Sequence, residues 1–221
     1  MRSPPTPITS KDVTAFLNSC VLTRSSYEHH KILFDAGSKR RSLLEEISPI
    51  FFGDLHALLR DSIYLGICKL TDPEETRGRD NLTVKFLVKN SDFSIAPQDF
   101  AAIPALSEQI HKFREKIVAA RNRRIGHLDR TAAIGDGPLG AAQRPEWEKF
   151  WVDLGKFLSI FYRRYVDPAG VFELNHMGLT SDCDSLVKAL KESTYFHEII
   201  RDHSLTQRCA DIAVASKYAD V

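Results

Sequence analysis

The stretch PIFFGDLHALLRDSIYLGICKL, residues 49–70, carries the clearest structural signal in the chain. Its apolar residues recur at helical spacing with few charges between them: Phe51, Phe52, Leu55, Leu58, Leu59, Ile63, Ile67 and Leu70. An apolar stripe of this breadth predicts a buried helix at the centre of a helical protein. The helix should end at Asp72-Pro73, because proline disfavours helical geometry in the residue before it.

Helical patterns extend to both sides of this stretch. Upstream, Ser10 is placed to cap one helix, and a helical pattern resumes over residues 24–47 with Gly37 as a candidate break. Downstream, we expect helices at 82–88, 105–124, 145–166 and 184–201, the last with an extension toward Tyr218. We expect connectors at residues 74–81 and 135–140. No run of residues alternates between apolar and polar for long enough to predict a sheet. The sequence therefore predicts an all-α, single-domain helical bundle over residues 11–221, behind a flexible lead at residues 1–10.

Composition sets the broad class of the protein. A chain of 221 residues with 43% hydrophobic content can bury one core, and its net charge of +1 lacks the large excess typical of proteins that bind long nucleic acid. The proline-rich start resembles no signal peptide, and no segment has the ~18 apolar residues of a membrane span. The cysteines are too scattered for a metal or redox motif: Cys20, Cys68, Cys183 and Cys209. We expect a soluble cytoplasmic protein with reduced thiols.

Positive charge is concentrated in one segment. Residues 111–130 hold seven lysines and arginines against only Glu115 and Asp129. Within this segment, residues 119–129 read AARNRRIGHLD and contain Arg121, Asn122 and His127. A guanidinium, an amide and an imidazole are groups that hold a phosphate and move a proton.

The spacing of these residues constrains their geometry. The apolar stripe of residues 105–124 leads to Arg121, so the guanidinium should lie at the edge of the packed face and needs a partner or a groove. His127 follows six residues later, roughly 120° around and about 9 Å along an ideal helix. Either Gly126 loosens the last turn, or the two residues flank a cleft that something else completes.

Structural explanations also exist for each residue. Arg121 can pair with Asp129 or another carboxylate, and His127 stands at an ordinary position for a histidine near a helix C-terminus. Arg123, Arg124 and Arg130 can form a solvated basic face, although such a face also holds an RNA backbone. The aromatic stripe of the helix at 145–166 is typical of a core, or of an interface in a protein that pairs.

The chain resembles the HEPN superfamily of small helical proteins, whose signature is an arginine, a polar residue that is often asparagine, and a histidine a short distance downstream. Arg121, Asn122 and His127 match this signature. The abortive-infection branch is the most similar, through DSI at 61–63, KLTDP at 69–73 and GRDNL at 78–82. The resemblance covers residues 24–165.

This resemblance implies a helical bundle that forms a homodimer, with the motifs of two chains in one cleft, and metal-independent cleavage of RNA. His127 would take the proton of a 2′-hydroxyl, Arg121 would neutralise charge on the phosphate, and Asn122 would orient either group. Lys116 and the arginines at 123, 124 and 130 would bind the RNA. The expected protein needs no cofactor or metal, and it acts as a toxin or antiphage effector with an antitoxin or other neutralising partner.

Two alternatives remain open at this point. The chain can be a non-catalytic module that binds RNA or nucleotides in the same basic groove. It can also be an interaction protein in which Arg121 is structural and the aromatic stripe is the working surface.

Overall fold

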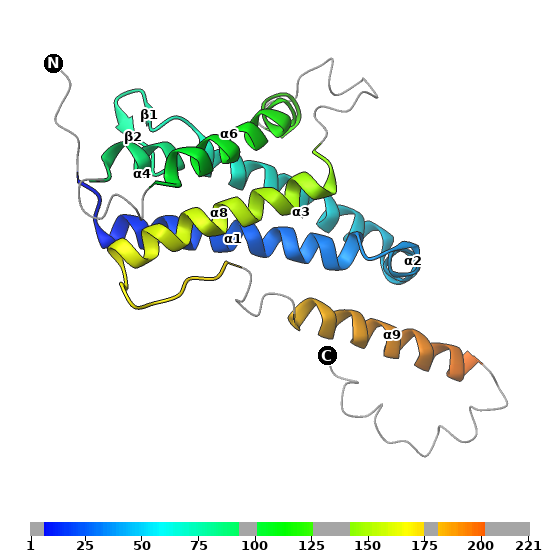
Figure 1. Cartoon of the computed structure of the whole chain (residues 1–221). Coiled ribbons are helices and arrows are strands. Elements are labelled where there is room, and N and C mark those ends of the chain that lie inside the picture. Colours follow the sequence, from blue (N-terminus) through cyan, green and yellow to red (C-terminus); the bar gives the residue numbers. More distant parts are fainter. Residues whose placement is uncertain (1–6, 93–100, 126–141, 175–180, 202–221) are drawn as a thin grey trace. The chain divides into compact units, whose positions relative to one another are not determined.

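The computed structural model describes residues 7–92, 101–125, 142–174 and 181–201 (Figure 1). Contacts divide the chain into two compact units: Met1–His30 with Ala57–Leu179, and Lys31–His56 with Thr180–Val221. The described elements are helices apart from one two-stranded hairpin. The all-α prediction is confirmed, whereas the single domain over 11–221 stays a prediction.

The first three helices are α1 (Ser10–Phe34), α2 (Ser38–Ile47) and α3 (Pro49–Thr71). Helix α1 is continuous where the sequence indicated two separate helical patterns. The break comes at Gly37, whose φ of 109° lies in the region that favours glycine, as expected. Helix α3 ends directly before Asp72-Pro73, also as predicted.

Residues 7–9 are described before α1 and contact it. The backbone N–H of Thr9 donates to Asp12 Oδ2 at 2.9 Å, and the Thr9 hydroxyl donates to the same oxygen at 2.6 Å. These bonds satisfy donors at the start of the helix. Ile8 is buried in the core, so the end of the expected flexible lead packs against the bundle.

The connector at 74–81 forms a small antiparallel hairpin, β1 (Glu75–Thr76) and β2 (Arg79–Asp80), where no sheet was expected. Positive φ angles at Arg77 (53°) and Gly78 (75°) make the tight turn. Two-residue strands are too short to show alternation in the sequence, and this explains the wrong prediction.

Four helices follow among the described residues: α4 (Val84–Asn90), α6 (Ile103–Ala120), α8 (Arg144–Tyr165) and α9 (Ser181–Arg201). The Thr83 hydroxyl caps α4 by accepting from the Phe86 N–H at 3.2 Å. All four helices match the predictions to within a few residues. The exception is the end of the helix expected at 105–124, because residues Arg121–Ile125 form a π-helical turn, η1.

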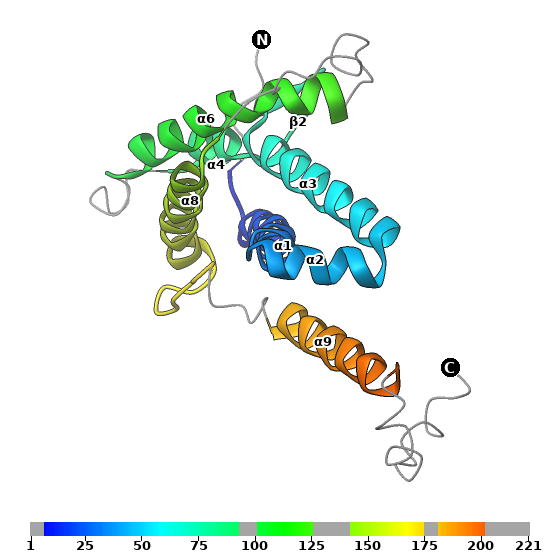
Figure 2. The ribbon, with the colours of Figure 1, turned by 90° about the vertical axis from the view of Figure 1, so that its right-hand side faces the viewer.

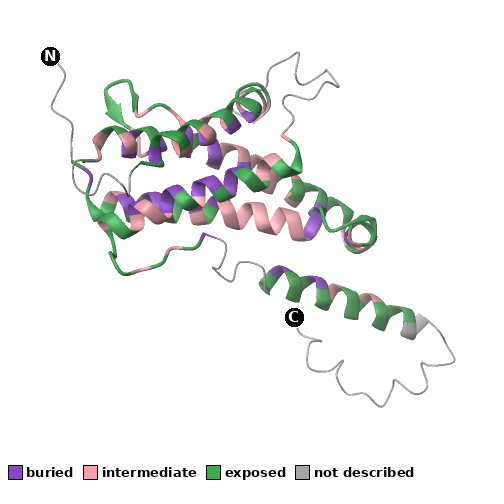
Figure 3. Cartoon of the chain, viewed as in Figure 1, coloured by how far each residue is buried: buried purple, intermediate pink, exposed green. Residues whose placement is uncertain are grey.

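The core of the first unit joins α1, α3, α4, α6 and α8 (Figures 1 and 2). Figure 3 shows its buried residues along α6, α8 and the first half of α1. Helix α8 contributes the largest share, with four aromatic residues and two leucines: Phe150, Trp151, Phe157, Phe161, Leu154 and Leu158. The aromatic stripe is therefore core, and the hypothesis that it forms a working surface is wrong for these buried residues.

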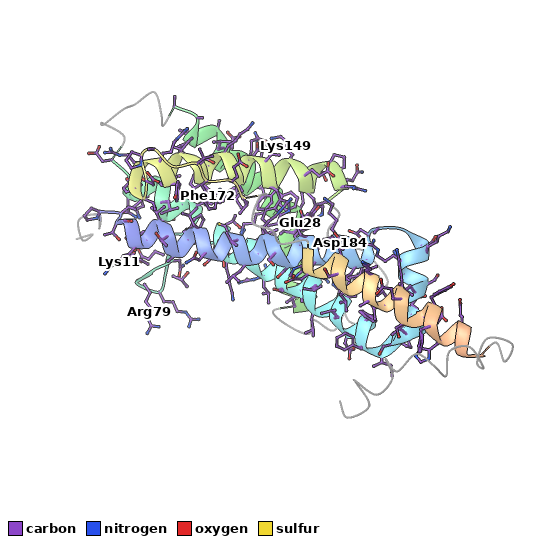
Figure 4. The ribbon with its side chains drawn as sticks, turned by 90° about the horizontal axis from the view of Figure 1, so that it is seen from below. Lys11, Glu28, Arg79, Lys149, Phe172 and Asp184 are labelled. Carbon is purple, nitrogen blue, oxygen red and sulfur yellow. The ribbon has the colours of Figure 1, made fainter. Side chains whose placement is uncertain are left out.

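A nearly buried ion pair lies beside this core. Arg24 and Glu28 of α1 pair one turn apart, and their side chains are only 11% and 12% exposed. The Arg24 guanidinium lies 5.2 Å from the ring centre of Tyr27 and 5.0 Å from that of Trp151. Burial lowers the pKa of Arg24, although the charge of Glu28 opposes this shift. Figure 4 shows Glu28 on α1.

The second unit has a smaller core of its own. Leu44 and Phe52 are buried in it, and α2 contacts α9. Arg40 Nη1 donates to the carbonyl oxygen of Ile32 at 2.6 Å and lies 3.9 Å from Asp184 Oδ1. None of the described helices is both long and apolar enough to cross a bilayer.

Candidate functional site

The end of α6 places Arg121 and Asn122 in the π-helical turn η1. The last buried residue of α6 before this turn is Ile117, and the N–H of Arg121 is shared between the carbonyls of Ile117 and Val118. A π-turn adds a residue to the helical repeat and is frequent at functional sites. Here it changes the direction of the side chains that follow, so positions on an ideal α-helix no longer describe the motif.

Arg121 lies at the edge of the packed face, as its position predicts. Its side chain is 34% exposed. Its Nη1 donates to Asn122 Oδ1 at 2.8 Å, and its Nη2 lies 3.6 Å from Asp72 Oδ2. The guanidinium is therefore oriented from two sides and remains partly open to solvent.

Asp72 joins Arg121 to a second arginine. Its Oδ1 accepts from Arg114 Nη2 at 2.8 Å, while its Oδ2 pairs with Arg121. The side chains of Asp72 and Arg114 are 23% and 24% exposed. This arginine–aspartate–arginine cluster lies where the end of α3 meets α6, and it carries one net positive charge. That charge favours the binding of a singly charged anion.

Sequence reasoning missed the roles of Asp72 and Arg114. Asp72 was recognised as the end of a helix and as part of the KLTDP segment of the resemblance, but not as a partner of Arg121, and Arg114 was only one cation among several. The carboxylate is 42 residues from Arg114 along the chain. A charge at a helix end followed by proline gives no signal of a partner at that distance.

His111 lies on α6 one turn before Arg114 and is half-buried. Its Nδ1 is 2.7 Å from the carbonyl oxygen of Ser107, which favours the tautomer with the proton on Nδ1. Burial lowers the pKa of His111, and the charges of Lys85 and Arg114 act in the same direction, against the bond to Ser107. The imidazole is therefore neutral at neutral pH.

The lowered pKa of His111 predicts a loss of stability in acid. The unfolded chain, with a histidine pKa near 6.5, binds the proton more readily than the folded chain. Stability should therefore fall as the pH drops below about 6.5, and His111→Gln should remove part of this dependence. Urea unfolding of both proteins at about pH 7 and pH 5 measures the difference. An equal loss of stability in both would contradict this role of His111.

Cys68 lies close enough to the arginine cluster to be affected by it. The charges of Arg114 and Arg121 lower its pKa, but burial raises it more, and the net pKa is raised. The thiol stays protonated and is a poor nucleophile. Cys20, Cys68 and Cys183 are free thiols, as expected, while Cys209 lies outside the described residues.

Only some of the other residues predicted for the site are described by the structure. Lys116 forms an ion pair with Glu146 at the start of α8, so its charge is shared. Arg123 is exposed on η1. Of Arg124 only the backbone is described. His127 and Arg130 lie outside the described residues, and so does Asp129, the carboxylate first considered for Arg121. The carboxylate that pairs with Arg121 is Asp72.

These groups can bind and polarise an anion. Two guanidiniums about one carboxylate offer charged donors, and the partly exposed Arg121 is held at a defined angle by Asn122. Among the described residues, no three histidine, cysteine, aspartate or glutamate side chains gather as they would around a metal ion.

The family model for HEPN domains of the AbiU2 type matches residues 11–168. This range includes the helices of the first unit, the Asp72 cluster and the whole arginine–asparagine–histidine motif. No significant match was found among curated proteins or among solved structures. The match covers more than half of the chain, and the chain belongs to the AbiU2 family of HEPN domains, which are domains of the abortive-infection type.

Proposed function

We propose that this HEPN domain is a metal-independent endoribonuclease that acts as a toxin or abortive-infection effector. The observation that supports it best is the placement of Arg121: partly exposed, oriented by Asn122 and Asp72, and followed within six residues by His127. Family membership supports the same proposal. The protein would act on RNA in the cytoplasm, and an antitoxin or other neutralising partner would inhibit it.

The proposed reaction needs a base and a cation. His127, neutral, takes the proton of the 2′-hydroxyl, and the resulting oxygen attacks the adjacent phosphorus. The bond to the 5′-oxygen of the next nucleotide breaks, which leaves a 2′,3′-cyclic phosphate, and protonated His127 can return its proton to that leaving oxygen. Arg121 stabilises the charge that develops on the phosphoryl oxygens.

Asp72 has a defined role in this proposal. Its contact with Arg121 spans 3.6 Å, which is longer than a hydrogen bond, whereas its contact with Arg114 is 2.8 Å. A phosphate oxygen can therefore displace the weaker contact while Arg114 keeps Asp72 in place. Arg123 and Arg124 of η1, with Lys116 and Arg130, would bind neighbouring phosphates of the RNA backbone.

Incubation of the purified protein with single-stranded RNA in excess EDTA tests this function. We expect cleavage to persist in the chelator and to be lost in His127→Ala. Cleavage that stops in EDTA and returns with added magnesium would contradict the metal-independent mechanism. RNA that is bound without being cut would support the alternative, a non-catalytic RNA-binding module, which the contacts of Arg121 with Asp72 and Asn122 also allow.

We further propose that two chains form a homodimer and share one cleft across a two-fold axis; family membership supports this proposal, in which Arg121 and His127, six residues apart in the sequence, come from different chains. Arg121→Ala and His127→Ala should each be inactive alone. A mixed dimer keeps one arginine and one histidine on different chains, and it should regain part of the activity when the two variants are co-expressed with different tags. A verified mixed dimer without activity, or a strictly monomeric protein, would contradict the shared cleft.

A further inference from the structure

A groove of about 770 Å³ lies between α6 and α8, at the end of the bundle away from Arg121. Helices α6 and α8 run antiparallel: Lys116, late in α6, pairs with Glu146 at the start of α8, whereas the groove is lined by the first turns of α6 and by α8 from Trp151 to Arg163. It is therefore separate from the arginine cluster. Its volume is within the range of about 300–1,000 Å³ of small-molecule sites.

Residues 172–174, which follow α8, form a second wall of the groove. After α8 the chain turns back along the helix, and the Ser159 hydroxyl lies 2.8 Å from the carbonyl oxygen of Phe172. The Phe172 ring packs on Tyr162 with ring centres 5.6 Å apart, and Figure 4 shows Phe172 beside α8. The turn is tightly packed at Gly170, where a Cβ would lie 2.6 Å from side-chain atoms of both Asp167 and Tyr162. These contacts hold residues 172–174 in place beside the helix.

The chemistry of the lining favours one class of occupant. Leu106, Ile160, Phe172 and Leu174 supply an apolar and mainly aliphatic surface. The charged side chains of the lining are two cations on α8 and one carboxylate on the second wall: Lys156, Arg163 and Glu173. The Ser159 hydroxyl donates to the carbonyl oxygen of Phe172. The neutral side-chain hydrogen-bonding groups that remain in the lining are the Gln109 amide and the buried Trp151 indole N–H, so few groups are available to recognise the edge of a nucleobase.

We propose that this groove binds a single-chain amphiphile with an anionic head, such as a fatty carboxylate or an alkyl phosphate. The aliphatic chain lies on the apolar surface, and the head group is held by Lys156 and Arg163. Glu173 weakens the attraction and reduces the net charge of the lining to one positive charge. This site does not depend on the ribonuclease proposal.

Calorimetric titration of the full chain with dodecanoate, dodecanol and dodecyltrimethylammonium, all below micellar concentration, tests the chemistry. The three probes share a chain and differ in the charge of the head. We expect one dodecanoate to bind per chain, and dodecanol and the ammonium compound to bind at least about tenfold more weakly. Dodecyl phosphate should behave like dodecanoate. Equal binding of the charged and neutral probes, or no binding of dodecanoate, would overturn the proposal.

Substitutions in the lining test the location. Lys156→Gln and Arg163→Gln should each weaken dodecanoate binding about three- to tenfold, whereas Glu173→Gln should strengthen it about two- to fivefold. Arg164→Gln is the matched control, because Arg164 is exposed on α8 but does not line the groove. A loss in Arg164→Gln equal to that in Arg163→Gln would contradict the assignment.

Filling the groove gives an independent test. Ala105 is exposed and lines the groove, so Ala105→Phe should block dodecanoate binding without disturbing the core. Ala119→Phe places the same bulk on an exposed position of α6 outside the groove and should leave binding unchanged. Unaltered binding in Ala105→Phe would overturn the proposal, and so would AMP that competes with dodecanoate, because it would identify a nucleotide site.

Discussion

Arg121→Ala should lower the rate of RNA cleavage by about 10²–10³-fold while the protein stays folded. Loss of a preorganised donor that stabilises transition-state charge has an effect of this size, and the side chain is exposed enough for its removal to leave no buried cavity. Single-turnover cleavage of a labelled single-stranded RNA measures the rate. Arg164→Ala, an exposed arginine near the end of α8, is the control and should cleave at the normal rate.

Variants of Asp72 and Arg121 distinguish a structural role of Arg121 from a catalytic one. If Asp72 acts through Arg121, the effects of Asp72→Asn and Arg121→Ala on cleavage will not add in the double variant. If Arg121 serves only the fold, Arg121→Ala will lower the free energy of unfolding and leave the cleavage rate per folded molecule unchanged. That result would contradict the catalytic assignment.

The second prediction with a large expected effect concerns the free energy of unfolding. Arg24→Ala should lower the free energy of unfolding by about 3–5 kcal/mol, the usual cost of breaking a buried ion pair by removing one partner. The same change removes two cation–π contacts, with Tyr27 and Trp151. Urea denaturation measures the loss.

A matched pair on the surface provides the control for Arg24. Arg144 and Glu148 are also an arginine and a glutamate one turn apart, but their side chains are 71% and 55% exposed. Arg144→Ala should therefore cost no more than about 0.5 kcal/mol. Replacing Arg24 and Glu28 together by leucine should cost less than Arg24→Ala alone, since no carboxylate then loses its partner. Equal losses in Arg24→Ala and Arg144→Ala would show that burial does not strengthen the pair.

Local signals in the sequence were sufficient for most of the fold. The end of α3 at Asp72-Pro73 and the aromatic face of α8 depend on residues within one or two turns of each other, and the structure agrees with them. The apolar stripe of α3 is only partly buried: Ile63, Ile67 and Leu70 are in the core, whereas Phe51 and Leu58 are exposed. The hairpin at 75–80 was missed because its geometry depends on positive φ angles at Arg77 and Gly78 rather than on hydrophobic alternation.

The candidate site was only partly predictable. The position of Arg121 at the end of an apolar stripe correctly indicated that the guanidinium needs a partner. It did not identify Asp72, because the contact forms between the end of α3 and the end of α6, which only the packed bundle brings together. The π-turn at residues 121–125 was also missed, since its residues fit a regular helix equally well. The role of His127 stays a prediction.

The ends of the RNA products test the central claim most directly. Single-stranded RNA is incubated with the protein in excess EDTA, and the new termini are identified by mass spectrometry, with His127→Ala as the control. Attack by the neighbouring 2′-hydroxyl predicts 2′,3′-cyclic phosphates, or the phosphates derived from them, opposite 5′-hydroxyl ends, and no cleavage by the variant. Products with 3′-hydroxyl ends, or equal cleavage by His127→Ala, would contradict the account.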